Sequence, residues 1–328
     1  MISYRNELCR ALLHKIKVMK QKASLQKIAF FALLIICVTP YIEPPLALIL
    51  GFVVSFFIGH PYMKHNSVAA KYLLQFSVVG LGFGMNLTEA IQVGKEGLIF
   101  TVASIFFTLI VGLIIGRYLK INRSTSTLIS GGTAICGGSA IAALAPVINA
   151  KDEDISVAMA CIFILNALAL LIFPVIGHQL SMSQNQFGLW SAIAIHDTSS
   201  VIGSAQKYGE EALKIATTVK LERALWIIPV SILLSFLNKN AVKKIKIPYF
   251  ILGFIGAILL VYYFPQIKPF GEVMVFIAKK ALNVTLFLIA SGLSMTAIKK
   301  VGVKPLLQGV LLWIFISVGS LLVILETV

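Results

Sequence analysis

The chain has 328 residues, of which 58% are hydrophobic and 12% are charged, whereas an ordinary soluble domain has roughly 45–50% and 25%. Its mean hydropathy of +0.93 excludes a water-soluble globule. The net charge is +15, and the basic residues lie between long apolar runs. Such a distribution indicates how the chain is oriented in a membrane, and we expect no nucleic-acid partner.

Residues 1–27 form a basic segment with Ile2, Leu8, Leu12 and other apolar residues between the cations. This pattern is typical of a basic amphipathic helix on the anionic cytoplasmic surface of a membrane. A frayed charged leader is an equally good interpretation. No small-residue cleavage site follows, which argues against a removable signal peptide.

Residues 28–328 predict an all-α, polytopic membrane domain, because a bilayer core requires about 20 apolar residues for each spanning helix. Eleven candidate segments follow one another along the chain. They are Ile28–Ile42, Pro45–Gly59, Val68–Gly84, Gly97–Leu119, Ser124–Ile148, Ile155–Gly177, Phe187–Ala205, Ala212–Leu237, Tyr249–Phe264, Ala281–Ile298 and Pro305–Leu325.

Lys and Arg are distributed unevenly between the loops. If the N-terminus is cytoplasmic, the loops on that side hold most of the cations, and the loops on the other side hold most of the acids. This bias predicts a multi-pass protein of the cell membrane with its N-terminus inside and, with eleven segments, its C-terminus outside.

Two pairs of segments resemble each other. VVGLGFGMNL from Val78 matches LIASGLSMTA from Leu288, and an odd offset in segment number gives them opposite directions across the bilayer. AICGGSAIAALAPV from Ala134 matches AIHDTSSVIGSA from Ala194, although these two segments would be parallel unless one is re-entrant. Inverted repeats with interrupted helices are typical of secondary transporters.

SGGTAICGGSAIA (Ser130–Ala142) places two glycine pairs within an apolar run. Glycine destabilises a helix interior by roughly 1 kcal/mol relative to alanine, so the pairs favour an interrupted helix. A half-helix that starts near Gly138 or Ser139 would direct its positive end into the protein, where it would bind an anion. Close packing of an unbroken helix through small residues is the alternative.

The run from His196 to Ser200 places five polar residues together inside an apolar segment. A buried carboxylate is costly unless it is paired, solvated or protonated, and histidine titrates near neutral pH. His196 and Asp197 are therefore candidates for proton coupling. An extramembrane loop is the alternative, since the flanking apolar runs are short.

Lys220, Glu222 and Arg223 interrupt the apolar run TTVKLERALWIIPV. Lys220 and Arg223 are three residues apart, so they share a helix face and would attract an oxyanion. Glu222 is a third candidate for proton coupling. A structural ion-pair network between helices explains these residues almost equally well. Asn166 and Asn283 are more typical of helix–helix hydrogen bonds than of ligands.

Cys9, Cys37, Cys136 and Cys161 are scattered, with no C-x-x-C pair or Cys/His cluster. The sequence therefore predicts neither a disulfide framework nor a metal site, and we expect no cofactor.

GGTAICGGSAIAALAPVI, GLWSAIAIHDTSSVIGSA, GEEALKIATTVKLERALWIIPV and IASGLSMTAI together resemble a family of bacterial inner-membrane proteins named as sulfate exporters. The resemblance runs from Ile28 to the C-terminus. After Ala-Ile-His-Asp the family usually has a small apolar residue and then Ala-Gln, whereas this chain has the more polar Thr198, Ser199 and Ser200.

That family looks related to the bile-acid symporters and the cation/proton antiporters. The relation implies inverted repeats, a panel domain, and a core domain with two crossing interrupted helices that moves like an elevator or by rocking. By analogy it also implies a homodimer.

The leading hypothesis is a secondary active transporter of a small anion, such as sulfate or a sulfonate, coupled to protons and embedded in membrane lipid. A cation/proton antiporter that uses Asp197 and Glu222 is the alternative. An intramembrane serine hydrolase with Ser139 as nucleophile and His196 as base is a remote third, and we expect no enzyme. The candidate substrate ligands are Gly131, Gly132, Thr133, Cys136, Gly137, Gly138, Ser139, Thr198, Ser199, Ser200, Lys220 and Arg223, and the candidate proton-coupling residues are His196, Asp197 and Glu222.

Overall fold

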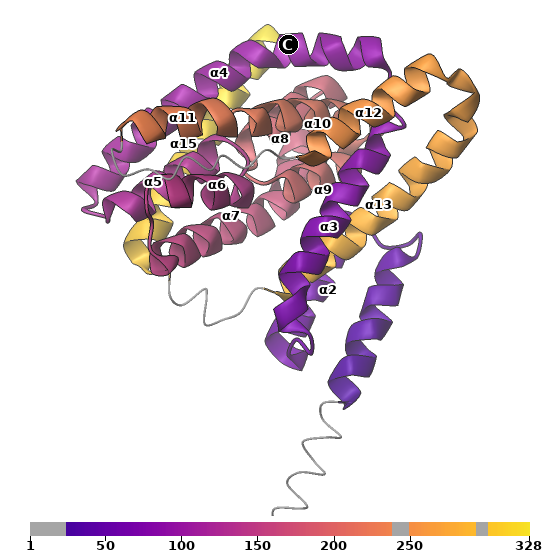
Figure 1. Ribbon diagram of the computed structural model, residues 1–328, viewed down its shortest axis with the longest axis horizontal. Helices are drawn as coiled ribbons and strands as arrows, with labels where there is room; N and C mark the ends of the chain where they lie inside the picture. Colours follow the sequence, from indigo (N-terminus) through magenta and orange to yellow (C-terminus); the bar gives the residue numbers. More distant parts are fainter. Residues whose placement is uncertain (1–23, 238–248, 293–300) are drawn as a thin grey trace, which may run out of the picture.

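The computed structural model describes residues 24–237, 249–292 and 301–328, and all regular structure in these ranges is helical (Figure 1). The predicted all-α class is therefore confirmed. Most of the predicted N-terminal amphipathic segment, residues 1–23, lies outside the described residues.

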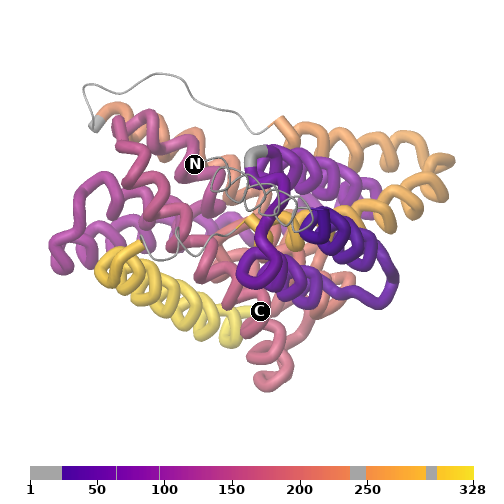
Figure 2. Tube along the Cα trace, turned by 90° about the horizontal axis from the view of Figure 1, so that it is seen from below, coloured from indigo at the N-terminus to yellow at the C-terminus, as the bar shows by residue number. Residues whose placement is uncertain are grey.

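The helices form two groups that lie side by side in both Figure 1 and Figure 2. The first, which we call the α13 group, consists of the helix Ser24–Val38, α2 (Pro44–Val53) with a π-helical turn at Val54–Ile58, α3 (Met63–Gly82), α12 (Tyr249–Tyr263), a 3-10 turn at Pro265–Ile267 and α13 (Lys268–Ser291). Helix α13 packs against α2 and α3, and α12 packs against α3. Phe30, Ala47 and Phe287 share one buried apolar cluster, which brings Ser24–Val38 into this group.

The second group, which we call the α10 group, contains the remaining helices. They are α4 (Leu87–Tyr118), α5 (Arg123–Ala134), α6 (Gly138–Val147), α7 (Asp152–Gln179), α8 (Gln184–Ala194), α9 (Thr198–Tyr208), α10 (Glu210–Leu225), α11 (Ile227–Leu237) and α15 (Val303–Thr327). Helix α10 packs against α4, α8 and α9, while α15, yellow in Figure 2, lies along α4, α5, α7 and α8.

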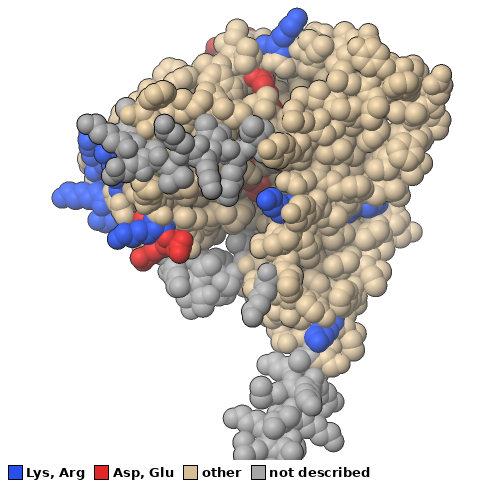
Figure 3. All heavy atoms as spheres, in the orientation of Figure 1, with Lys and Arg blue, Asp and Glu red and all other residues tan. Residues whose placement is uncertain are grey.

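Several helices are long and apolar enough to cross a membrane. Within the described ranges, four helices have the length and hydropathy that a membrane span requires. They are Gly97–Tyr118 in α4, α7, Pro265–Ser291 and α15. A fifth is added if α3 and the start of α4, which meet at a 111° bend, form one broken span. The eleven predicted segments are therefore not all recovered as spans, because several of them are short helices or are divided at an interruption. Figure 3 shows that the face of the molecule in view is largely uncharged, as a lipid-facing surface requires.

The predicted start of the segment Ala281–Ile298 is wrong, because α13 begins at Lys268. Lys279 and Lys280 look like loop residues in the sequence, but they lie inside the helix, and their long side chains reach acceptors on neighbouring elements. Lys280 Nζ donates to the carbonyl oxygen of Thr39 at 2.8 Å, and Lys279 forms an ion pair with a glutamate of α10. The end of this predicted segment, from residue 293, lies outside the described residues and includes part of the repeat that begins at Leu288.

Asp154 joins the start of α5 to the start of α7. Its side chain is buried, and Oδ1 accepts hydrogen bonds from Asn122 Nδ2 at 3.0 Å and from Thr125 Oγ1 at 2.6 Å. Oδ2 accepts from the backbone N–H of Lys151 at 3.4 Å, within the capping box of α7. A negative charge is stabilising near a helix N-terminus, so this carboxylate holds both helix starts in place.

We expect Asp154→Ala to lower the free energy of unfolding by about 2 kcal/mol, because it removes a cap and leaves buried donors without an acceptor. Glu153→Ala is the matched control, since Glu153 lies in the same first turn but is exposed, and its effect should stay below about 0.5 kcal/mol. Denaturant unfolding of the purified protein in detergent measures both. Equal effects of the two substitutions would contradict the assigned role of Asp154.

Candidate functional site

The α10 group contains two helical hairpins, α5–α6 and α8–α9, in each of which two short helices fold back on each other at a break. Helix α5 ends at Ala134 and α6 begins at Gly138, while α8 ends at Ala194 and α9 begins at Thr198. The break at the glycine pairs is as predicted. The two breaks also coincide in the predicted match between the segments that start at Ala134 and Ala194, since all four boundaries are aligned.

The two interruptions touch each other. Gly137 has φ +67°, and a Cβ at this position would lie 3.0 Å from the Cβ of Asp197 and 3.3 Å from Cγ2 of Ile162. Only glycine adopts this backbone conformation without strain and permits so close an approach. We call this contact, between residues 135–137 and residues 195–197, the crossing.

Both C-terminal helix ends at the crossing receive a cation from α10. Lys220 Nζ donates to the carbonyl oxygens of Ala192 at 3.2 Å and Ile195 at 2.6 Å, at the end of α8. Arg223 donates through one terminal nitrogen to the carbonyl oxygen of Ala134, at the end of α5, and through the other to Ser104 Oγ at 2.8 Å. Lys220 and Arg223 are both fully buried, and each compensates a negative helix end.

The N-terminal end of α9 is compensated by its own cap. Asp197 Oδ1 accepts from the backbone N–H of Ser200 at 2.8 Å and from Ser199 Oγ at 2.6 Å, and Oδ2 accepts from Ser200 Oγ at 3.1 Å. The side chains of Thr198, Ser199 and Ser200 are buried. Four predicted site residues therefore form one capped helix start, with its carboxylate at the positive end of α9.

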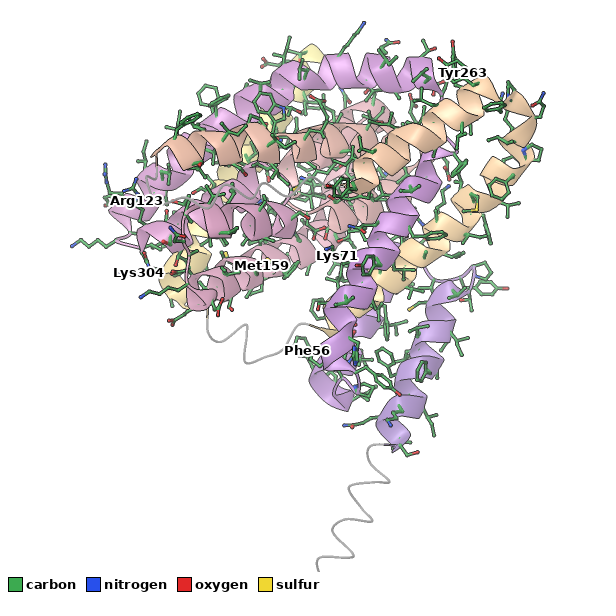
Figure 4. The ribbon with its side chains drawn as sticks, in the orientation of Figure 1. Phe56, Lys71, Arg123, Met159, Tyr263 and Lys304 are labelled. Atoms are coloured by element: carbon green, nitrogen blue, oxygen red, sulfur yellow. The ribbon has the colours of Figure 1, made fainter. Side chains whose placement is uncertain are left out.

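The N-terminal end of α6 differs from the other three ends. Its N-cap is Gly137, which has no side chain to accept a hydrogen bond, and its first turn holds no acidic residue. Gly138 is half-buried and Ser139 is exposed. Met159 of α7, labelled in Figure 4, lies beside this turn, since a Cβ at Gly138 would lie 3.3 Å from its Sδ. The positive end of α6 is thus accessible and faces no carboxylate of the described residues, and the Cys136 thiol is the group that meets the backbone N–H of Ala140 in its first turn.

Small residues also let α5 and α6 pack closely against each other in their hairpin. A Cβ at Gly131 would overlap Leu144 Cδ1, and a Cβ at Gly132 would lie 3.1 Å from Ile141 Cδ1. The break and the small-residue packing, which the sequence offers as alternatives, therefore occur together. Cys136, in the break itself, is a buried free thiol.

Asn166 of α7 holds the second break. Its Oδ1 accepts from the backbone N–H of His196 at 3.1 Å and of Asp197 at 3.3 Å. The His196 side chain is fully buried, and neither ring nitrogen has a partner among the described residues. The exposed Ser139 is therefore not hydrogen-bonded to His196 in this structure. Thr133 Oγ1 is also buried without a partner in the described part of the chain.

Glu222 faces α4. A Cβ at Gly97 would lie 3.4 Å from Glu222 Oε2, and both carboxylate oxygens are buried without a hydrogen-bond partner within the described ranges. An unpaired buried carboxylate is costly when ionised, and this cost favours a group that exchanges a proton.

Two partners at the crossing are not evident from the sequence. Ser104, which binds Arg223, is one of four Ser and Thr residues in α4, and nothing in the sequence distinguishes it from the other three. Asn166 is expected from the sequence only as a residue that forms helix–helix hydrogen bonds, and the structure shows which backbone groups it holds. A side chain that binds backbone groups has no characteristic spacing from them in the sequence. Its isolation as a polar residue in an apolar segment is the one signal of such a role.

The comparisons with known proteins give the family. Residues 24–309 match the family described as Conserved hypothetical protein 698. The UPF0324 membrane protein of Bacteroides thetaiotaomicron is 55% identical over 283 residues, which is 86% of each chain. That of Bdellovibrio bacteriovorus is 51% identical over 311 residues, 92% of this chain and 96% of the relative. No solved structure matches.

These names describe proteins of a membrane and state no substrate. Together with the apolar helices they establish a multi-pass membrane protein, while sulfate and the symporter superfamily stay outside what the comparisons show. The chain belongs to the Conserved hypothetical protein 698 family, the UPF0324 membrane proteins.

Proposed function

We propose that this protein is a secondary active transporter of a small anion, such as sulfate or a sulfonate, with its binding site at the start of α6. One observation carries the proposal. Of the four half-helix ends at the crossing, three are compensated by Lys220, Arg223 and Asp197, and the fourth, at Gly138 and Ser139, is open.

The open end has the properties of an anion site. The first backbone N–H groups of a helix have no intrahelical acceptor, and the helix dipole places roughly half a positive charge there. The hydroxyl of the exposed Ser139 adds a donor. Lys220 and Arg223 bind carbonyl oxygens, so in this proposal they set the positive potential of the crossing and hold its backbone.

Transport requires two alternating arrangements, and the two helix groups supply parts that can move against each other. We assign the α13 group to the panel and the α10 group to the core that carries the site. Arg123 at the start of α5 and Lys304 at the start of α15 lie at the same end of the molecule in Figure 4, away from Tyr263. This shared end fits the proposed orientation with the N-terminus inside.

Proton coupling is assigned to His196, Asp197 and Glu222. His196 and Glu222 support it because their polar atoms are buried and lack partners among the described residues. A gain or loss of a proton at such a group changes the charge beside the crossing.

The proposal is tested by flux of radiolabelled sulfate in proteoliposomes with and without a pH gradient. We expect flux that depends on the gradient, and we expect Ser139→Asp to reduce it at least tenfold, because a carboxylate at the start of α6 would occupy the anion's place. Ser156→Asp, at an exposed serine of α7, is the matched control and should leave flux unchanged. Absence of sulfate and sulfonate flux in the native protein under every gradient would refute anion transport.

The buried, unpartnered carboxylate of Glu222 favours a second candidate, a cation/proton antiporter. Currents on a solid-supported membrane separate the two functions. An antiporter gives a current in a sodium or potassium gradient when no permeant anion is present, whereas an anion transporter gives no current under these conditions.

A further inference from the structure

Two exposed ion pairs join the two helix groups at one place. The described residues contain three ion pairs, of which Lys207–Glu43 and Lys279–Glu210 connect the α10 group to the α13 group. Lys207 is near the end of α9 and Glu210 is the first residue of α10, so both pairs start from the same turn.

That turn is fixed within its own group by hydrogen bonds. Tyr208 donates its hydroxyl to the carbonyl oxygen of Met182 at 2.6 Å. Gln184 Oε1 accepts from the backbone N–H groups of Glu211 at 2.9 Å and Ala212 at 3.3 Å. The turn therefore moves with α8 and α10 as one unit.

The partners on the other side are fixed in the α13 group. Lys280 binds the carbonyl oxygen of Thr39, and Asn283 Nδ2 donates to the carbonyl oxygen of Ile42 at 2.7 Å. These bonds tie the segment that leads to Glu43 onto α13, the helix that also carries Lys279. Both ends of each ion pair are thus anchored. If the groups separate here, the ion pairs must break together with the apolar packing of α9 on α2 and α13.

The two pairs are weak in comparison with these anchors. The side chains of Lys207 and Glu43 are 39% and 51% exposed, and those of Lys279 and Glu210 are 20% and 77% exposed. Exposed ion pairs contribute little to stability and are screened by salt. A contact of this kind is suited to repeated opening.

A small cleft lies behind the Lys279–Glu210 pair. Its volume is about 40 Å³, which is enough for water. Its lining comes from α3, the turn that follows α3, α10 and α13, and includes Met85, Glu210, Thr217 and Lys279. Thr217 of this lining lies three residues before Lys220 on α10, which is the cation that binds the end of α8 at the crossing.

We propose that Lys207–Glu43 and Lys279–Glu210 form a latch that closes this cleft, and that the cleft is the water-filled access route to the crossing when the latch opens. The inference rests on the proposed transport function, in that it names the gate of the same site. In the proposed orientation the latch faces the outside of the cell.

The test measures access to the cleft without any substrate. Thr217→Cys, in a background with the four native cysteines replaced by serine, is labelled with a membrane-impermeant methanethiosulfonate in proteoliposomes. We expect Glu43→Gln with Glu210→Gln to raise the labelling rate at least fivefold. Exchanging the charges of each pair, with Glu43→Lys, Lys207→Glu, Glu210→Lys and Lys279→Glu together, should return the rate to the native value.

Glu89→Gln is the matched control. It breaks the third ion pair, Lys214–Glu89, which borders the same cleft through Lys214 but joins two helices of the α10 group. It should therefore leave labelling unchanged, because no contact between the two groups is lost. Raising the salt concentration from about 0.05 M to 0.5 M should accelerate labelling of the protein with the native latch, because salt screens its ion pairs. It should have no effect on the Glu43→Gln, Glu210→Gln variant, in which the ion pairs are absent. If the Thr217→Cys protein does not fold, Met85→Cys on the opposite wall serves as the reporter.

Equal labelling rates in the native, neutral and exchanged latches would overturn the inference, as would the same acceleration by Glu89→Gln. Because labelling requires no transported ion, this outcome is separate from the sulfate test. Sulfate flux without latch-dependent labelling would support the transport function and contradict the latch. Latch-dependent labelling without sulfate flux would support the latch and contradict the transport function.

Discussion

Gly137→Ala is expected to abolish sulfate flux and to lower the free energy of unfolding by about 3 kcal/mol. The backbone at Gly137 has φ +67° and ψ −124°, a conformation that costs a residue with a Cβ about 1–3 kcal/mol. The added methyl group would also lie 3.0 Å from the Cβ of Asp197, so the two interruptions would have to move apart. The start of α6 and the cap of α9 would then lose their relative placement.

Gly256→Ala is the matched control for this substitution. Gly256 lies inside α12, and a Cβ there would meet no atom within 4 Å, so alanine should be neutral or stabilise the helix by about 0.5–1 kcal/mol. Denaturant unfolding in detergent and sulfate flux in proteoliposomes measure both proteins. Normal flux and stability in Gly137→Ala would show that the close contact at the crossing is not required.

The first interruption could be predicted from the sequence, because two glycine pairs in an apolar run oppose a continuous helix. The polar run from His196 to Ser200 by itself favours a buried polar site or a loop. Its match to the segment at Ala134 is the feature that places a second break at the equivalent position. What the pattern did not contain is their contact, because the neighbour of Gly137 lies 60 positions away along the chain.

The compensation of the helix ends could not be predicted, for a different reason. Lys220 and Arg223 share a helix face, as their spacing requires, yet each reaches a different half-helix and binds carbonyl oxygens. Every residue carries a carbonyl group, so no sequence pattern shows which one a buried cation will find. The misplaced start of α13 has the same origin, since the acceptor of Lys280 is a backbone oxygen at Thr39.

Arg223→Ala tests whether this cation holds the fold of the crossing or only attracts an anion. Its removal leaves the carbonyl oxygen of Ala134 and the hydroxyl of Ser104 without their donor. It also leaves a cavity where the large, fully buried arginine side chain was. We expect the free energy of unfolding to fall by about 3 kcal/mol or more, from the unsatisfied groups and the cavity together. Arg223→Lys should recover part of this loss, because it restores the charge with a single donor group in place of the two-pronged guanidinium.

Arg123→Ala is the control, since Arg123 lies exposed at the opposite end of α5 and its removal should cost less than about 0.5 kcal/mol. Unfolding in detergent is measured beside the concentration dependence of sulfate flux. A residue that serves only as an anion ligand would raise KM and leave the unfolding midpoint unchanged, and that result for Arg223→Ala would contradict its role at the end of α5. The expected result is a lower midpoint in Arg223→Ala that Arg223→Lys partly restores, because the negative end of α5 requires a cation whether or not an anion is bound.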